Sequence, residues 1–144
     1  LLDEPYGWGG LLNNRDCSSF TQDYFATFGK FLHRNSKAQL SNGKYLDMSN
    51  LSNNEKKEFM KKNGVPFSTL VYLKGHVMLY IGVKENEPLI FKNIGSVKIK
   101  NSDRKKYRHI IGKATITTLE PGKNIKDFDE DTNILNRIQG IVIL

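Results

Sequence analysis

The chain is poor in cysteine. Its 144 residues include only one, at position 17, which excludes an internal disulfide and a thiolate-rich zinc site. It also lacks any apolar run near the roughly 20 residues that a membrane-spanning helix needs, so we expect no integral membrane segment. No signal peptide is recognisable. Because the first residue is Leu, we expect the chain to be a trimmed piece of a longer protein.

Acidic residues are outnumbered by basic ones, 15 against 22, which gives a net charge of +7. Such an excess fits either a basic, soluble surface or an anionic partner such as nucleic acid, a membrane surface or a wall polymer. The sequence has no nucleic-acid-binding motif and no basic–aromatic platform, so we expect no nucleic-acid partner. The length suits one domain, over residues 1–144, that buries its own core.

Helix signals dominate the first half of the chain. Asp16 is a plausible N-cap and Gly29 a plausible C-terminal stop for one helix. Two capping-box patterns predict further helices: Ser36 with Gln39, and Ser52 with Glu55 before a helix over Lys56–Asn63 that Gly64 ends. The Gly-rich segment Leu1–Asn14 is expected to be an irregular loop.

After Pro66 the pattern changes to short β-rich runs separated by turn residues. The expected strands are Thr69–Leu73, Val77–Val83, Leu89–Phe91, Val97–Ile99, Tyr107–Leu119 and Ile141–Leu144. Pro121-Gly122 predicts a turn, and the acidic segment Asn124–Asn133 a loop. Helices followed by antiparallel strands indicate an α+β domain.

The segment Asp16-Cys17-Ser18-Ser19-Phe20 carries the most chemical information. If Asp16 caps a helix, Cys17 lies in its first turn, where free N–H groups and the helix dipole favour a thiolate. The pattern therefore predicts a lowered thiol pKa and a nucleophilic Cys17 whose neighbouring N–H groups stabilise an oxyanion. The alternative is a buried cysteine that only packs.

A thiol nucleophile needs a base, and the candidates are His33, His76 and His109. His76 follows Gly75 at the start of a predicted strand, an accessible position at a strand edge. His33 comes just after the first helix, and His109 lies within a β-rich run that favours a surface or sheet role. His76 is the favourite, although a strand-edge histidine without a catalytic role is the competing interpretation.

Four segments together resemble the NlpC/p60 family of papain-like bacterial cysteine peptidases. In order they are Tyr6-Gly7-Trp8-Gly9-Gly10, Arg15-Asp16-Cys17-Ser18-Ser19, Arg34-Asn35-Ser36 with Gln39, and the run from Gly75-His76 to Gly82. Gly112-Lys113-Ala114 and Thr117-Thr118-Leu119 with Pro121-Gly122 are similar to the subgroup with upstream bacterial SH3-type domains, which this chain lacks. The resemblance implies a papain-like fold in which helices bearing the Cys pack on an antiparallel sheet bearing the His.

The resemblance also implies an activity. Family members cut stem peptides of peptidoglycan, commonly between D-γ-glutamate and a diamino acid. Cys17 would attack this carbonyl to form an acyl-enzyme, and His76 would take the thiol proton and return it to the leaving amine. Stem peptides or muropeptides are the implied partners, with no cofactor and no metal. The implied location is the cell envelope, with cytoplasmic recycling of wall fragments as the other place where this chemistry fits.

The resemblance assigns substrate contacts to residues around the nucleophile: Tyr6, Arg15, Asp16, Ser18, Ser19 and Gly75. Tyr6 matches a family aromatic that orients substrate or donates to the oxyanion, against the alternative of loop packing. Arg15 and Asp16 are expected to contact the charged groups of a stem peptide, or Asp16 only to cap its helix.

One position departs from the family pattern. The family has a third polar residue, usually His and sometimes Asn or Gln, that accepts a hydrogen bond from the imidazole. Here Lys92 takes that position, Gly95 replaces an expected Trp, and a charged lysine can only donate. Asn93 could serve after a local shift, or a backbone carbonyl or water could orient His76.

The same departure motivates a different function. With the third residue lost, the domain would bind wall peptides without cutting them. Amidase or acyl-transfer chemistry on another substrate also stays open, because those reactions share the nucleophile and the base.

Overall fold

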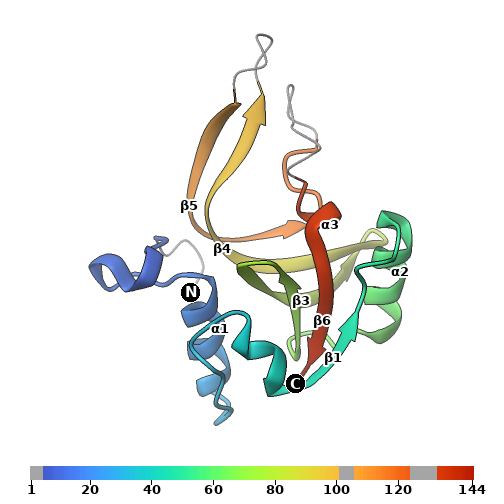
Figure 1. Ribbon diagram of the computed structural model, residues 1–144, viewed down its shortest axis with the longest axis horizontal. Coiled ribbons are helices and arrows are strands. Elements are labelled where there is room, and N and C mark those ends of the chain that lie inside the picture. The colour runs from blue at the N-terminus through green and yellow to red at the C-terminus, as the bar shows by residue number, and fades with distance from the viewer. Residues whose placement is uncertain (1–4, 101–105, 124–132) are drawn as a thin grey trace.

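A six-stranded antiparallel sheet in the order β1-β6-β2-β3-β4-β5 organises the chain (Figure 1). The computed structural model describes residues 5–100, 106–123 and 133–144. The strands are β1 (Lys44–Asp47), β2 (Thr69–Leu73), β3 (His76–Lys84), β4 (Glu87–Lys100), β5 (Lys106–Thr118) and β6 (Ile138–Ile143). The predicted α+β class, with helices on an antiparallel sheet, is confirmed.

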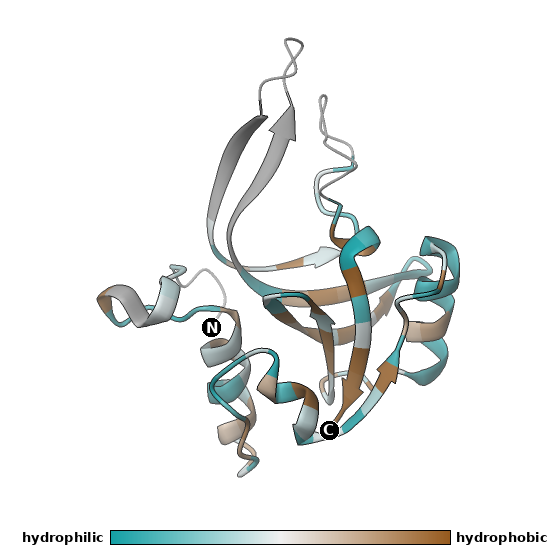
Figure 2. Cartoon of the chain, in the orientation of Figure 1, coloured by the Kyte–Doolittle hydropathy of each residue, from teal (hydrophilic) through white to brown (hydrophobic). Residues whose placement is uncertain are grey.

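The central strands are rich in hydrophobic residues, brown in Figure 2, and their side chains form an apolar cluster on each face of the sheet. In β3, Val77 and Leu79 pack on one face with residues of α1 (Cys17–Ala26). Met78 and Tyr80 pack on the other face with Met60 of α2 (Asn53–Asn63). Because successive side chains of a strand point to opposite faces, one strand supplies both cores.

The helices match the predicted caps in two places and differ in two. Asp16 caps α1 and Ser52 caps α2, each within a capping box as expected. α1 ends at Ala26 rather than at Gly29, which lies in the following turn with φ +71°. The prediction of a capping box at Ser36 and Gln39 is wrong.

At that position a 3₁₀ helix, η2 (Ala38–Asn42), begins instead. The Asn35 side chain accepts hydrogen bonds from the backbone N–H groups of Lys37 and Ala38, at 2.9 and 3.4 Å. Gln39 is fully buried, and its amide donates to the carbonyls of Ser18 and His33. Its side chain therefore joins η2 to α1 rather than capping a helix.

Other segments differ from the sequence-based expectation. Within the expected loop Leu1–Asn14, a 3₁₀ helix, η1 (Trp8–Asn13), forms. Leu89–Phe91 and Val97–Ile99 belong to a single strand, β4. The sequence did not indicate β1 or α3 (Ile134–Arg137), and β6 begins at Ile138, before the predicted Ile141.

The C-terminal part of the chain agrees with two further expectations where it is described. The turn at Pro121-Gly122 is present. Of the expected loop Asn124–Asn133, only Asn133 lies within the described residues, where it caps α3. Among the described residues, no helix has the length and apolar character needed to cross a bilayer.

A substitution at Gly140 of β6 tests how closely β6 packs against β1. A Cβ atom added there would lie 2.5 Å from Leu46 O and 2.5 Å from Tyr45 Cε2, both on β1. We expect Gly140→Ala to lower the free energy of unfolding by about 2 kcal/mol or more, measured by urea unfolding. Gly29→Ala is the control: its Cβ meets nothing within 4 Å, so only the positive φ costs energy, about 1 kcal/mol. Equal losses for the two variants would contradict the clash.

Candidate active site

The start of α1 fixes the position of Cys17. The Asp16 carboxylate accepts a hydrogen bond of 2.9 Å from Ser19 N, and the Ser19 hydroxyl accepts one of 2.9 Å from Asp16 N. This reciprocal capping box satisfies N–H groups that the first helical turn leaves free. Cys17, the first residue of α1, is 6% exposed.

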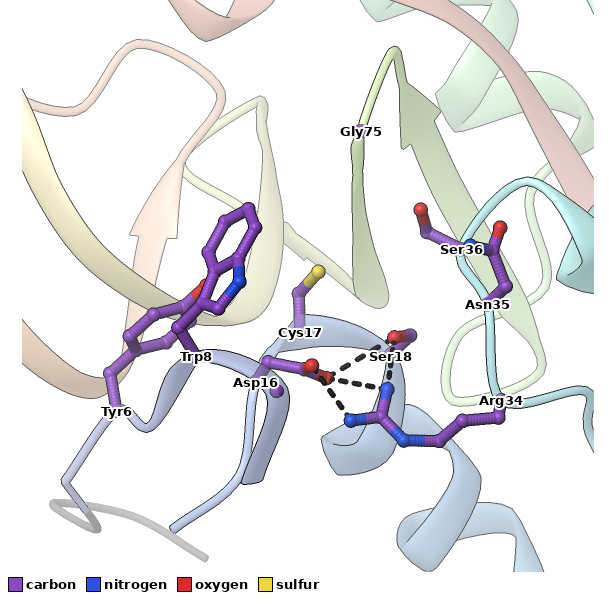
Figure 3. Close-up of a pocket in the computed structure, with 10 residues that line it drawn as sticks. Tyr6, Trp8, Asp16, Cys17, Ser18, Arg34, Asn35, Ser36 and Gly75 are labelled. Carbon is purple, nitrogen blue, oxygen red and sulfur yellow. Dashed lines mark hydrogen bonds and ion pairs between the residues drawn. The ribbon is translucent and has the colours of Figure 1, made fainter. Parts of the chain in front are cut away.

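Arg34 completes this arrangement from the segment between α1 and η2. Its guanidinium donates to both Asp16 carboxylate oxygens, at 3.0 and 2.8 Å, and to Ser18 Oγ at 2.9 Å (Figure 3). Burial raises the pKa of Asp16, but hydrogen bonds from Arg34 and Ser19 outweigh it and lower this pKa to about 2. Asp16 is therefore a carboxylate at any physiological pH.

A cleft of about 400 Å³ opens above Cys17. Figure 3 shows Tyr6 and Trp8 on one side of the cysteine and Asn35 and Ser36 on the other, with the sulfur directed into the space between them. Of the residues that the sequence predicted for the site, the cleft is lined by Tyr6, Asp16, Cys17, Ser18 and Gly75.

Two predicted substrate residues do not line the cleft. The Arg15 guanidinium donates from Nε to Asp23 Oδ2 at 2.6 Å, further along α1. Ser19 uses its hydroxyl within the capping box.

Five further residues line the cleft that the sequence analysis did not assign to the site: Trp8, Gly9, Arg34, Asn35 and Ser36. All of them lie in segments that carried the family resemblance. The family motifs therefore indicated the segments that line the cleft. The sequence separation between residue 17 and residues 34–36 gave no physical reason to place them together.

The predicted lowering of the Cys17 thiol pKa is wrong. Burial raises this pKa, and the negative charge of Asp16 adds to the effect. The backbone N–H groups of Val77 and Ser18 act in the opposite direction without overcoming it. In the resting site the thiol therefore holds its proton.

His76 is the first residue of β3, directly after a two-residue turn. Gly75 in that turn has φ +80°, a conformation that favours glycine. Burial, Lys92 and Arg137 lower the pKa of His76 to about 4, against a smaller opposing effect of Asp16. Its Nε2 atom is buried without a hydrogen-bond partner in the described part of the chain.

Lys92 lies behind His76, in the middle of β4. Its side chain is fully buried, Nζ has no hydrogen-bond partner in the described part of the chain, and burial lowers its pKa to about 7. Asn93, the next residue, donates from Nδ2 to Arg15 O at 2.7 Å. Its Oδ1 atom is buried and accepts no hydrogen bond from a described residue.

At neutral pH Cys17 therefore carries a protonated thiol and His76 a neutral imidazole. No hydrogen bond joins the two side chains among the described contacts. A protonated thiol and a neutral imidazole are the forms that general-base catalysis uses, in contrast to a preformed thiolate–imidazolium ion pair. In the ranges 5–100, 106–123 and 133–144, no three His, Cys, Asp or Glu side chains gather to hold a metal ion.

Comparison of the sequence and the structure with known proteins identifies the family. The model of the NlpC/P60 family matches residues 3–115, most of the chain. This chain belongs to the NlpC/P60 family. A solved structure of an NlpC/P60 endopeptidase from Photobacterium damselae subsp. piscicida is similar, with 27% sequence identity and a TM-score of 0.84.

That alignment covers 99% of this chain but 36% of the Photobacterium protein, so this chain corresponds to about a third of its relative. The search of curated proteins found no match. The family membership and the papain-like NlpC/P60 fold implied by the sequence are both confirmed.

The burial of Lys92 has a measurable effect on stability. An unfolded lysine titrates near 10.5 and the folded one at about 7, so the unfolded chain binds more protons between these values and stability rises with pH across that window. We expect Lys92→Met to stabilise the fold by a few kcal/mol at pH 7, and less as the pH approaches 10.5. Urea unfolding at pH 7 and pH 10 measures the difference. The exposed Lys62→Met is the control, and a pH-independent gain at residue 92 would contradict the burial cost.

Proposed function

We propose that this chain is a cysteine endopeptidase that hydrolyses peptidoglycan stem peptides between D-γ-glutamate and a diamino acid. The observation that carries the proposal is Cys17 at the first turn of α1, in the wall of an open cleft, in a member of the NlpC/P60 family. The helix packs against β3, the strand that begins with His76. A location in the cell envelope goes with this substrate.

The reaction follows from the atoms in the site. Cys17 Sγ attacks the carbonyl carbon as its proton passes to His76, and the oxygen of the tetrahedral intermediate is held by the Cys17 backbone N–H. Collapse forms a thioester, and the imidazolium gives its proton to the leaving amine. Water, deprotonated by His76, then hydrolyses the thioester and frees the thiol.

The cleft offers recognition for the charged groups of a stem peptide. The Arg34 side chain is 48% exposed, and the Asp16 side chain beside it is 15% exposed. A guanidinium binds carboxylates with paired hydrogen bonds, and a carboxylate binds an amine. Arg34 therefore suits a peptide carboxylate and Asp16 the free N-terminal amine, while Tyr6 and Trp8 form an apolar wall opposite them.

A second candidate function is supported by Lys92. A buried Nζ without a partner close to His76 disfavours an imidazolium at that position, and a site weakened in this way would bind wall peptides without cutting them.

Turnover of purified stem tri- and tetrapeptides, followed by mass spectrometry, tests the proposal. We expect the unmodified chain to release L-Ala-D-Glu, and Cys17→Ala and His76→Ala to abolish release while retaining the fold. Residual activity of Cys17→Ala at the unmodified rate would reject the nucleophile. Binding of peptide without any release would favour the second candidate.

Substitution of Arg15 and of Arg34 tests which of the two arginines near Cys17 binds the substrate. We expect Arg34→Gln to raise KM about tenfold, because a charged carboxylate partner is lost. Arg15→Gln should have the smaller effect, because that side chain pairs with Asp23 outside the cleft. The KM values of the two variants, measured under the same conditions, show which arginine contacts the substrate. A larger increase in KM for Arg15→Gln would indicate that Arg15, not Arg34, binds the peptide carboxylate.

A further inference from the structure

Basic residues are concentrated in one short part of the chain. Residues 96–110 contain six of the 22 Lys and Arg residues but only one of the 15 Asp and Glu residues, so they carry +5 of the net charge of +7. This stretch includes the end of β4 and the start of β5. The positive charge of the domain therefore belongs mainly to these two strand ends.

The two strand ends form a ribbon beyond the main sheet. In the described pairing, β3 follows β4 only as far as Phe91, whereas β4 and β5 pair on to Lys100 and Lys106. Figure 1 shows the two strands running on together away from the other strands. We call the paired residues 96–100 and 106–110 the basic ribbon. A two-stranded ribbon is only marginally stable by itself, so a partner that covers one of its faces would stabilise it.

The register of the basic ribbon places like charges opposite each other. Lys98 pairs with Arg108, and Lys100 pairs with Lys106. Residues two apart in a strand share a face, so one face of the ribbon carries all four cations. Like charges directly opposite destabilise a sheet, and neither β5 nor the part of β4 after Glu87 contains an Asp or Glu to offset them. An anionic partner would remove this cost.

The opposite face of the basic ribbon has an apolar character. Val97 pairs with His109, and Ile99 pairs with Tyr107. A soluble polyanion would neutralise the cations but leave these apolar residues in water. A bilayer with anionic lipids offers phosphates and hydrocarbon side by side, and tyrosine is favoured at that boundary. An apolar face opposite a cationic face is also what allows amphipathic helices to lie in the boundary.

We propose that the basic ribbon binds the surface of a bilayer that contains anionic lipids. Val97, Ile99 and Tyr107 enter the boundary between headgroups and acyl chains. The four cations bind lipid phosphates, and the aliphatic stems of the lysines cover apolar surface. Each Lys or Arg at an anionic surface strengthens binding about fivefold. This inference goes beyond the proposed reaction and does not depend on it.

The base of the basic ribbon lies next to the cleft. Tyr6 N donates to Gly112 O at 2.7 Å, and Pro5 pairs with Lys113. The Tyr6 side chain lines the cleft. Tyr107 precedes Gly112 in β5 by a stretch of extended strand that spans roughly 17 Å. Binding through the ribbon would therefore hold the cleft within a few nanometres of the lipid surface.

Vesicle binding by the full chain tests the inference. Sedimentation measures the fraction bound to vesicles of phosphatidylcholine alone and to vesicles with an equal part of phosphatidylglycerol. We expect at least about tenfold stronger partitioning onto the anionic vesicles, and most of that gain should vanish in about 1 M NaCl, because salt screens exposed charges. Equal partitioning onto the two kinds of vesicle, or binding to neither, would overturn the inference.

A double substitution tests the cationic face. Lys98→Gln with Lys106→Gln removes one cation from each like-charged pair, and partitioning onto anionic vesicles should fall about 25-fold. Pairing of the strands should not suffer, because repulsion is relieved. Lys62→Gln with Lys84→Gln is the control, with the same change of net charge at exposed positions on α2 and β3. A loss as large in the control would show that net charge alone attracts the chain, against the role of the ribbon.

A substitution on the other face distinguishes a bilayer from a soluble polyanion. Ile99→Thr keeps a β-branched side chain, so the strand is retained, but it removes apolar surface. We expect partitioning of this variant onto anionic vesicles to fall about fivefold, and its binding to inorganic polyphosphate to stay unchanged. If vesicle binding is unchanged in Ile99→Thr, or if the unmodified chain binds polyphosphate but no vesicles, the partner is a soluble polyanion and the proposal is wrong.

Discussion

The Asp16 carboxylate is the interaction on which the site depends. It caps α1, holds Ser18 and Ser19 through their hydroxyl and backbone groups, and accepts both arms of the Arg34 guanidinium. One partly buried charge thus fixes the helix start that carries Cys17 and the loop that forms the opposite wall of the cleft. Ion pairs of this kind are strong because several donors share one acceptor in a partly dry environment.

The same carboxylate opposes the reactivity that a helix N-terminus usually gives to a cysteine. Its negative charge and the burial of Cys17 keep the thiol protonated, while burial and two cations keep His76 neutral. Neither side chain is charged at neutral pH, so under the proposed mechanism charge separates only during attack on the substrate.

Local chemistry explains what could be predicted from the sequence. Asp16 and Ser52 cap their helices because a side-chain oxygen reaches the N–H group three residues on, and β2 matches its predicted bounds because its apolar run ends at turn residues on both sides. The other strands depend on pairing between segments that are far apart in the sequence. The polar strand β1 exists only through its pairing with β6, and the short run at Ile138 joins β6 because β2 accepts it.

The site, too, was predictable where local sequence determines it and not where distant contacts do. Cys17 and His76 could be proposed from their neighbours, and the motifs brought Tyr6 to the cleft. The thiol pKa could not be foreseen, because it depends on burial under β3 rather than on position in a helix. The role of Arg34 depends on a loop that returns to α1 through the buried Gln39.

The order of the strands also has a consequence for biosynthesis. β6 lies between β1 and β2, although it is made after every other strand. A nascent chain that has not yet emerged as far as residue 143 exposes an apolar edge of β2 and leaves β1 without a neighbour. Unpaired strand edges favour association with other chains, so the partly made sheet is open to such association until β6 fills the gap between β1 and β2.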